Sequence, residues 1–211
     1  GLKYEDQQLS GQLNASYNEY DSLTWNKVSG QNPATDSRTN VATTRIDGFT
    51  QYKYSGLGYV LAGMDWQQDR LLSKSRGFGG SKYEIPDRDN TGVFTSIYHT
   101  WNPVSFELTG RIDDNEQYGT HGTWQSALSL ALPERHRATL SYGTAFKAPN
   151  FQDLSSAKDQ KTLQAEKSQN WELGFTGDYN LFNWQLNFYR NEIDNLIVYE
   201  GFNTVNSTAN T

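Results

Sequence analysis

The chain has 211 residues, 18 Lys and Arg against 24 Asp and Glu, and a formal net charge of −6. It contains no cysteine, which excludes disulfides, cysteine-based metal sites and thiol nucleophiles. The acidic balance argues against a broad nucleic-acid surface, and the apolar runs are too short for a transmembrane helix. Aromatic residues make up 14% of the chain, which argues against disorder.

Alternation of apolar and polar residues is the main pattern, and it predicts β-strands, whereas no segment has a helical 3.6-residue stripe. In 104–113, for example, Val104 and Leu108 share one face and Glu107 and Arg111 share the other. The pattern predicts about ten strand passages. The clearest are 9–17, 104–113, 124–132, 138–146, 171–179 and 184–188, and less regular ones lie near 45–55, 57–67 and 92–101.

Short and long connections alternate between these strands. The short ones lie near 5–8, 55–57, 102–103, 133–135 and 180–182, and the long ones near 20–44, 68–91, 114–122, 147–167 and beyond 200. In an antiparallel up-and-down sheet this alternation places every short turn at one end and every long loop at the other. Outer-membrane barrels have this asymmetry, whereas the Greek-key links of soluble sandwiches do not require it.

The lengths and ends of the strands favour a transmembrane barrel. The alternating runs cover about 10–13 residues, as in spanning strands, whereas soluble strands average about 5–6. Aromatic residues gather at both ends of the runs, as at two lipid–water interfaces, although cross-strand packing in a soluble sheet is the alternative. The charged face suits a wet or plugged lumen, and a plugged lumen appears at about 22 strands. We therefore expect a piece of a larger barrel, with most strands and any plug outside this chain.

The sequence lacks the usual enzyme motifs, and we expect no enzymatic activity and no catalytic residue. Gly77–Lys82 lacks the spacing of a phosphate loop. Asp87–Gly92 resembles the start of a calcium loop, but Tyr98 stands where a bidentate Glu is needed. We therefore predict no metal site here. Asp113 and Asp114 are adjacent, so they point to opposite faces and are expected to anchor a loop.

Three segments resemble the TonB-dependent outer-membrane receptors: 141–150 (SYGTAFKAPN), 163–172 (LQAEKSQNWE, with Ala165 where the family usually has Pro) and 188–197 (FYRNEIDNLI). The resemblance implies a 22-stranded barrel around an N-terminal plug. Residues 1–211 would be part of the barrel domain, without the plug. It also implies location in the outer membrane of a Gram-negative cell and energised import of a scarce, large ligand.

Within this family the chain most resembles the receptors for vitamin B12 (cobalamin), through 63–67, 90–92 and 113–124. The alternatives are a siderophore or haem receptor, a passive porin or barrel adhesin, and a soluble β-sandwich binding module. The resemblance implies contact with TonB through the missing N-terminal region, and with outer-membrane lipid and lipopolysaccharide. It implies no cofactor in this chain, although calcium is possible in the full-length receptor.

The candidate ligand contacts lie in the predicted outer loops. The family has a ligand-contacting Thr just before a strand in the loop that corresponds to 20–44, and three threonines are candidates for it. Loop aromatics, expected to be exposed, suit a mostly apolar ligand pocket, although packing within the loops is the alternative. The candidates are Thr39, Thr43, Thr44, Trp25, Tyr83, Tyr118 and Phe151.

Overall fold

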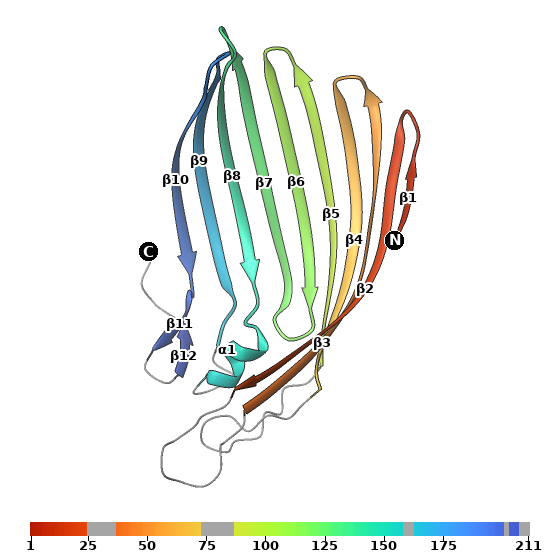
Figure 1. The fold of residues 1–211 in the computed structure, drawn as a ribbon, viewed down its shortest axis with the longest axis vertical. Helices are drawn as coiled ribbons and strands as arrows, with labels where there is room; N and C mark the ends of the chain where they lie inside the picture. The colour runs from red at the N-terminus through yellow and green to blue at the C-terminus, as the bar shows by residue number, and fades with distance from the viewer. Residues whose placement is uncertain (25–36, 73–86, 158–162, 201–202, 207–211) are drawn as a thin grey trace.

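The computed structural model describes residues 1–24, 37–72, 87–157, 163–200 and 203–206. Ten strands form one antiparallel sheet in which neighbours in sequence are neighbours in space (Figure 1). They are β1 (Leu2–Glu5), β2 (Leu9–Thr24), β3 (Ser37–Ser55), β4 (Gly58–Leu71), β5 (Arg88–Trp101), β6 (Val104–Asn115), β7 (Gly119–Leu132), β8 (His136–Lys147), β9 (Glu166–Asp178) and β10 (Asn183–Asp194). The predicted all-β, up-and-down fold is confirmed.

Three smaller elements lie at the end of the sheet opposite the short turns (Figure 1). Strands β11 (Ile197–Glu200) and β12 (Asn203–Asn206) pair with each other. Helix α1 (Phe151–Ser156) lies in the β8–β9 connection, where the sequence predicted only a long link. It begins because Asn150 and Asp153 cap each other's backbone amides, a local device that leaves no helical periodicity to detect.

One predicted loop is wrong. The connection expected at 114–122 is a turn of three residues, because β6 continues to Asn115 and β7 begins at Gly119. The side-chain oxygen of Asn115 accepts the backbone amides of Gln117 and Tyr118, at 3.2 and 3.1 Å, and closes the chain tightly. Asp113 and Asp114 are therefore both strand residues. Asp113 accepts hydrogen bonds from Asn90 and Arg111. Asp114, in contrast, accepts the Thr120 hydroxyl group across the turn at 2.9 Å and so anchors it, as predicted. Strands β2–β10 have 12–19 residues, longer than the alternating runs suggested.

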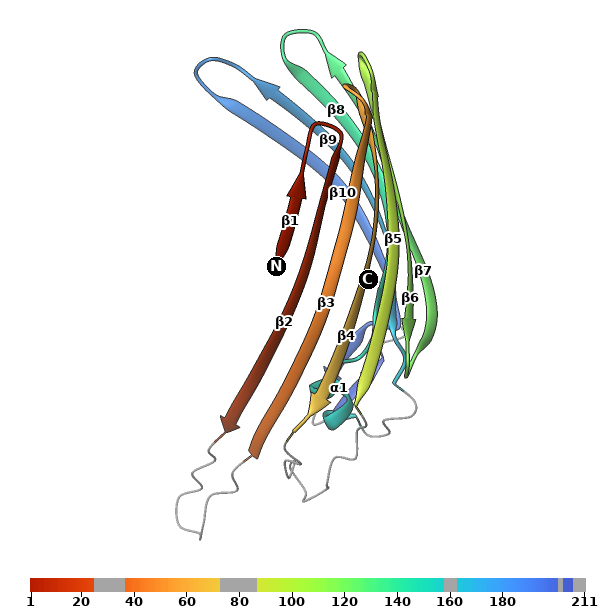
Figure 2. The ribbon, with the colours of Figure 1, turned by 90° about the vertical axis from the view of Figure 1, so that its right-hand side faces the viewer.

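The sheet is curved like part of a barrel wall (Figure 2). Its two faces differ in chemistry. On the face that we call the apolar face, one row crosses five strands in direct register: Phe106, Leu128, Leu140, Leu173 and Phe188. Leu128 and Leu140 remain 49% and 47% exposed, although they belong to the middle of the sheet. The opposite face, which we call the polar face, carries buried Asp65, Ser96 and Asp113.

Buried apolar side chains are scarce in the sheet itself. Among the described residues they are Ala42 and five on the β8–β9 connection, Pro149, Phe151, Leu154, Leu163 and Ala165. The small apolar core thus belongs to the connection, and the sheet has polar groups on one face and exposed apolar groups on the other. No helix in the described ranges has the length and hydrophobicity of a membrane-spanning helix.

Aromatic rings cluster at two places in the sheet. At the short turns, the Tyr54 ring stacks on His99 at 5.7 Å, and His99 contacts Trp101 at 4.4 Å. A second cluster joins Trp124, Tyr142 and Trp171, with ring centroids 4.9 and 4.5 Å apart. These three residues lie in the interior of β7, β8 and β9 and not at the strand ends, where Trp124 and Trp171 were predicted.

Candidate ligand site at the loop end of the polar face

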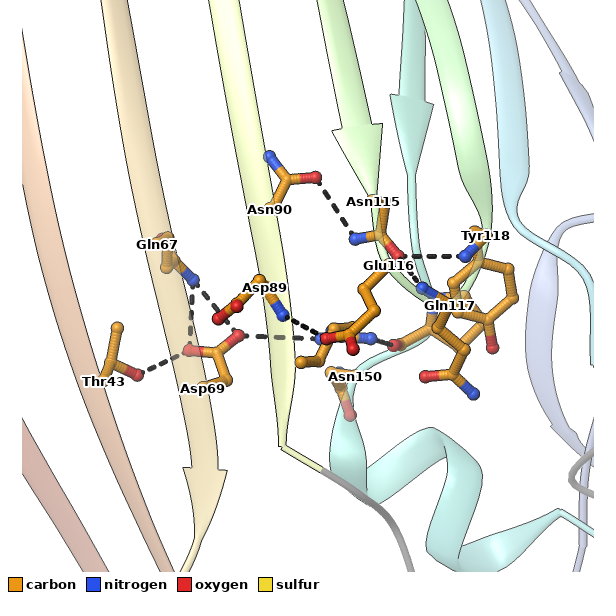
Figure 3. Close-up of polar contacts among 12 residues, drawn as sticks. Thr43, Gln67, Asp69, Asp89, Asn90, Asn115, Glu116, Gln117, Tyr118 and Asn150 are labelled. Atoms are coloured by element: carbon orange, nitrogen blue, oxygen red, sulfur yellow. Dashed lines mark hydrogen bonds and ion pairs between the residues drawn. The ribbon is translucent and has the colours of Figure 1, made fainter.

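Polar side chains follow the strand register across β3–β6 at the end with the longer connections (Figure 3). Alternation places every second residue of a strand on the same face, so paired polar residues form rows across the sheet. One row joins Thr43, Asp69 and Arg88, and the next joins Gln67, Asn90 and Asn115. We call these six residues the loop-end cluster.

Asp69 is the central acceptor of the first row. Thr43 Oγ1 donates to its Oδ1 at 2.8 Å, and Gln67 Nε2 donates to the same atom at 3.1 Å. The Arg88 guanidinium lies 3.6 Å from Oδ2. Three strands therefore converge on one carboxylate, which fixes the loop ends of β3, β4 and β5 relative to one another.

The second row continues onto β6. Asn90 Nδ2 donates to Asp113 Oδ1 at 3.1 Å, and Asn115 Nδ2 donates to Asn90 Oδ1 at 3.2 Å. Glu116, just past β6, accepts the Asp89 backbone amide at 3.1 Å. This row ties the tight β6–β7 turn to the start of β5.

Tyr118 lies on that turn and is half-buried. Its hydroxyl group is buried and has no hydrogen-bond partner among the described residues. Burial raises the pKa of the Tyr118 phenol, and the Asp153 carboxylate adds to this effect while Arg88 opposes it. The phenol is therefore neutral near pH 7 and can offer one donor and one acceptor.

A second set of charged groups lies deeper on the same face. Arg111 donates to Asp65 through Nη1 at 2.6 Å and Nη2 at 3.1 Å, and to Asp113 through Nε at 2.7 Å and Nη2 at 2.6 Å. Arg111 sits on β6 and its two partners sit on β4 and β6, with Gly92 of β5 between them in register. The guanidinium therefore bridges three strands.

The structure places the sequence-predicted contacts unevenly. Thr43 belongs to the loop-end cluster, whereas Thr44 pairs with Tyr17 and lies on the opposite face. Thr39 pairs with Ser22 near the loop end of β3. Trp25 and Tyr83 lie outside the described residues.

Phe151 was expected to be an exposed loop aromatic, but it is only 7% exposed. The Arg88 guanidinium lies over its ring, 5.3 Å from the centroid. Tyr118 and Phe151 thus lie at the same end of the wall as Thr43, although 33 residues separate Tyr118 from Phe151 in the chain. Whether either contacts a ligand stays a prediction.

Sequence reasoning missed most of the loop-end cluster, including Asp69, Arg88 and Asn115. The signal in the sequence was that these residues are polar and lie at alternate positions near the strand ends, in register with Thr43. The calcium-like segment has another role, because Asp87 pairs with Arg70 at 3.1 Å and Arg88 and Asn90 join the cluster. Within the described ranges no group of three or more His, Asp or Glu is arranged to hold a metal ion.

A family model for the β-barrel of TonB-dependent receptor-like proteins matches residues 1–211, the whole chain. The chain belongs to this family. That membership agrees with the antiparallel sheet and with the division into an apolar and a polar face. It is a family of receptors and transporters.

Solved structures share the fold. A mutant of the ferric enterobactin receptor PfeA from Pseudomonas aeruginosa has a TM-score of 0.78 and 18% identity over 92% of this chain and 34% of that one. The siderophore receptor PirA from the same organism has a TM-score of 0.78 and 16% identity over 98% and 42%. The copper transporter OprC has a TM-score of 0.67 and 12% identity over 90% and 36%. This chain therefore spans about a third to two fifths of these receptors.

Proposed function

We propose that the chain forms part of the wall of an outer-membrane barrel, with the apolar face toward lipid and the polar face toward a hydrated interior. The observation that carries this proposal is the exposure of Leu128 and Leu140 on one face, while Arg111, Asp65 and Asp113 share the other. Charged groups that face lipid at mid-membrane destabilise a barrel by about 2–4 kcal/mol each. Backbone pairing in lipid further requires that the sheet close with strands beyond this chain.

We infer that the parent protein imports a large, scarce metal complex with energy from TonB. Family membership supports energised import, and the loop-end cluster supplies polar groups where the longer connections would meet a ligand. The plug, a total of 22 strands and the contact with TonB are parts of this proposal. The outer membrane, with its lipid and lipopolysaccharide, is the location that it requires.

A ferric siderophore is the first ligand to test. PfeA is named for ferric enterobactin and PirA for siderophores, although identities of 18% and 16% support the common fold alone. Cobalamin is the second candidate, because 63–67, 90–92 and 113–124 resemble the cobalamin receptors. Both are bulky metal complexes that are too large for passive pores.

Tyr118 is the ligand contact that the geometry supports best. Its buried hydroxyl group has no partner in the described part of the chain, so a ligand that displaces the groups covering it would supply the missing hydrogen bond. Thr43 belongs to the loop-end cluster but already donates to Asp69. Thr39, Trp25 and Tyr83 remain proposed contacts, and Thr44 is disfavoured by its place on the apolar face.

The deciding experiment uses the full-length parent receptor in Gram-negative cells with and without TonB. Uptake of radiolabelled ferric enterobactin and of labelled cyanocobalamin is measured in both strains. TonB-dependent uptake of one ligand supports the proposal and identifies the ligand class. TonB-independent, unsaturable entry of both would indicate a passive pore, and uptake of neither would exclude both candidates.

The Tyr118 contact is tested in the same strains. Tyr118→Phe is expected to weaken binding of the transported ligand about 3- to 10-fold, the value of one neutral hydrogen bond. Tyr142→Phe, on the apolar face, is the matched control and is expected to leave affinity unchanged. Equal affinity in wild type and Tyr118→Phe would remove Tyr118 from the site.

A further inference from the structure

The β8–β9 connection does not stay beside the strands that it joins. β6 and β7 lie between β5 and β8 in the sheet, so β5 is three strand spacings from β8, about 14 Å. Nevertheless, Arg88 Nη1 at the start of β5 donates to the Pro149 carbonyl oxygen at 2.7 Å. The connection therefore crosses the ends of β6 and β7, and Figure 3 shows Asn150 and the start of α1 directly below the loop-end cluster.

Arg88 is held by three groups from two parts of the chain. The Pro149 carbonyl group and the Phe151 ring come from the connection, and the Asp69 carboxylate comes from β4. The Arg88 side chain is only 11% exposed. A buried guanidinium needs such partners because burial without them is costly. These contacts therefore stabilise the charge of Arg88 and fix the position of the β8–β9 connection.

The crossing segment is compact. Asn150 and Asp153 exchange two hydrogen bonds of 2.9 Å, and Leu154 is 1% exposed. An isolated helix of six residues is not stable in water. Consequently α1 depends on contacts outside itself: it lies against β12, and its Phe151 contacts Arg88 of β5.

We propose that Arg88 is the positioning residue that holds the segment Pro149–Ala157 across the loop end of the polar face. In this state the segment narrows the passage from the longer connections to the loop-end cluster. Release of Arg88 lets the segment swing away from β5 and widens that passage. The consequence for ligand entry rests on the proposed import function, whereas the latch itself does not.

Hydrogen exchange tests the latch in the full-length receptor in lipid. The amide of Leu154 donates to Asn150 and that of Ala157 to Leu154, so peptides over 149–157 report opening of the segment. Arg88→Gln is expected to raise their exchange rate about tenfold, equivalent to ~1.4 kcal/mol. Arg88→Lys keeps the charge beside Asp69 but loses the forked donor geometry and is expected to give a smaller increase.

Two further variants separate positioning from general stability. Arg70→Gln removes a neighbouring ion pair, with Asp87, that is more than half exposed, and it is expected to change exchange at 149–157 less than twofold. Phe151→Leu is expected to open the segment as Arg88→Gln does. Because the two residues act through one contact, the double variant should exchange no faster than the faster single variant.

Peptides from β9 and β10 must exchange as in wild type, which shows that the barrel is intact. Unchanged exchange at 149–157 in Arg88→Gln, or an increase equal to that of Arg70→Gln, would overturn the latch. If Arg88→Gln does not fold, Arg88→Lys and Phe151→Leu decide in the same way.

The entry step is tested by association kinetics with ferric enterobactin and cyanocobalamin. For whichever ligand binds wild type, Arg88→Gln is expected to raise the association rate constant several-fold. An unchanged rate constant in a variant whose exchange has risen would refute the narrowing of the passage. If neither ligand binds wild type, the ligand assignment fails, while the exchange result still decides the latch.

Discussion

Arg111 lies over Gly92, and the missing side chain at Gly92 makes room for its guanidinium. A Cβ atom added to Gly92 would lie 2.5 Å from Arg111 Cζ, well inside van der Waals contact. Asp65 and Asp113 are the direct register partners of Gly92 on either side, and both bind the same guanidinium. Gly92 therefore leaves the space that the Arg111 guanidinium occupies while it pairs with Asp65 and Asp113.

We predict that Gly92→Ala lowers the free energy of unfolding of the full-length receptor by about 1–3 kcal/mol, the usual cost of overpacking. Arg111 cannot move away freely because two carboxylates hold it. Gly110→Ala is the control, since a Cβ atom there meets nothing within 4 Å. Urea unfolding in lipid vesicles, followed by tryptophan fluorescence, measures both. Equal stability of the two variants would contradict the packing argument.

Removal of the bridging charge should be more costly than removal of a more exposed charge on the same face. Arg111→Met leaves Asp65 and Asp113 without their cation, and we expect a loss of about 2–3 kcal/mol, below the full cost of a buried pair because Arg111 is 29% exposed. Arg45→Met breaks a more exposed pair with Asp47 on the polar face and should cost under about 1 kcal/mol. Replacing both aspartates by Asn in the Arg111→Met background should recover most of the loss. The same unfolding assay checks this, and failure to recover would argue against charge as the cause.

The two-faced wall predicts opposite outcomes for neighbouring substitutions on β7. Leu128→Arg places a cation on the apolar face and should lower stability by about 2–4 kcal/mol in lipid vesicles. Gln125→Arg places the same cation on the polar face and should cost under about 1 kcal/mol. Refolding yield and urea unfolding in the same lipid measure both. If the order were reversed, the faces would have been assigned the wrong way round.

Tyr118 predicts an alkaline loss of stability. Burial raises the pKa of the folded phenol above its unfolded value of about 10, so the folded state holds this proton more tightly. The contribution of the Tyr118 proton to the free energy of unfolding is complete below pH 10, and it is lost as the pH rises through the pKa of the folded state. Tyr118→Phe should therefore flatten the fall in unfolding free energy between pH 9 and 11. An unchanged slope in that variant would mean that Tyr118 does not contribute.

The strands could be predicted because a sheet whose two faces differ in polarity imposes a period of two on every strand. In β6 the alternation continues through Asp113. The strand therefore extends further along the chain than its polar residues suggested. The error at 114–122 arose because Asn115 looks like a loop residue in sequence, whereas its side chain ends the strand by closing a three-residue turn.

The candidate site was less accessible to sequence reasoning. Thr43 and Thr44 are adjacent and chemically identical, and only the register decides which one faces Asp69. Phe151 looked like an exposed aromatic because its partner, Arg88, is far away in sequence and on another strand. Contacts across several strands leave no local pattern in the sequence, so only the folded structure reveals them.

The link between Arg88 and Pro149 spans 61 residues, whereas each strand otherwise pairs with its immediate successor. Hairpins between successive strands can form one at a time from nearby partners, but this contact requires β5, β6, β7 and β8 to be aligned first. It therefore forms late during assembly. A probe that senses it would report when this section of the wall has matured, independently of any ligand.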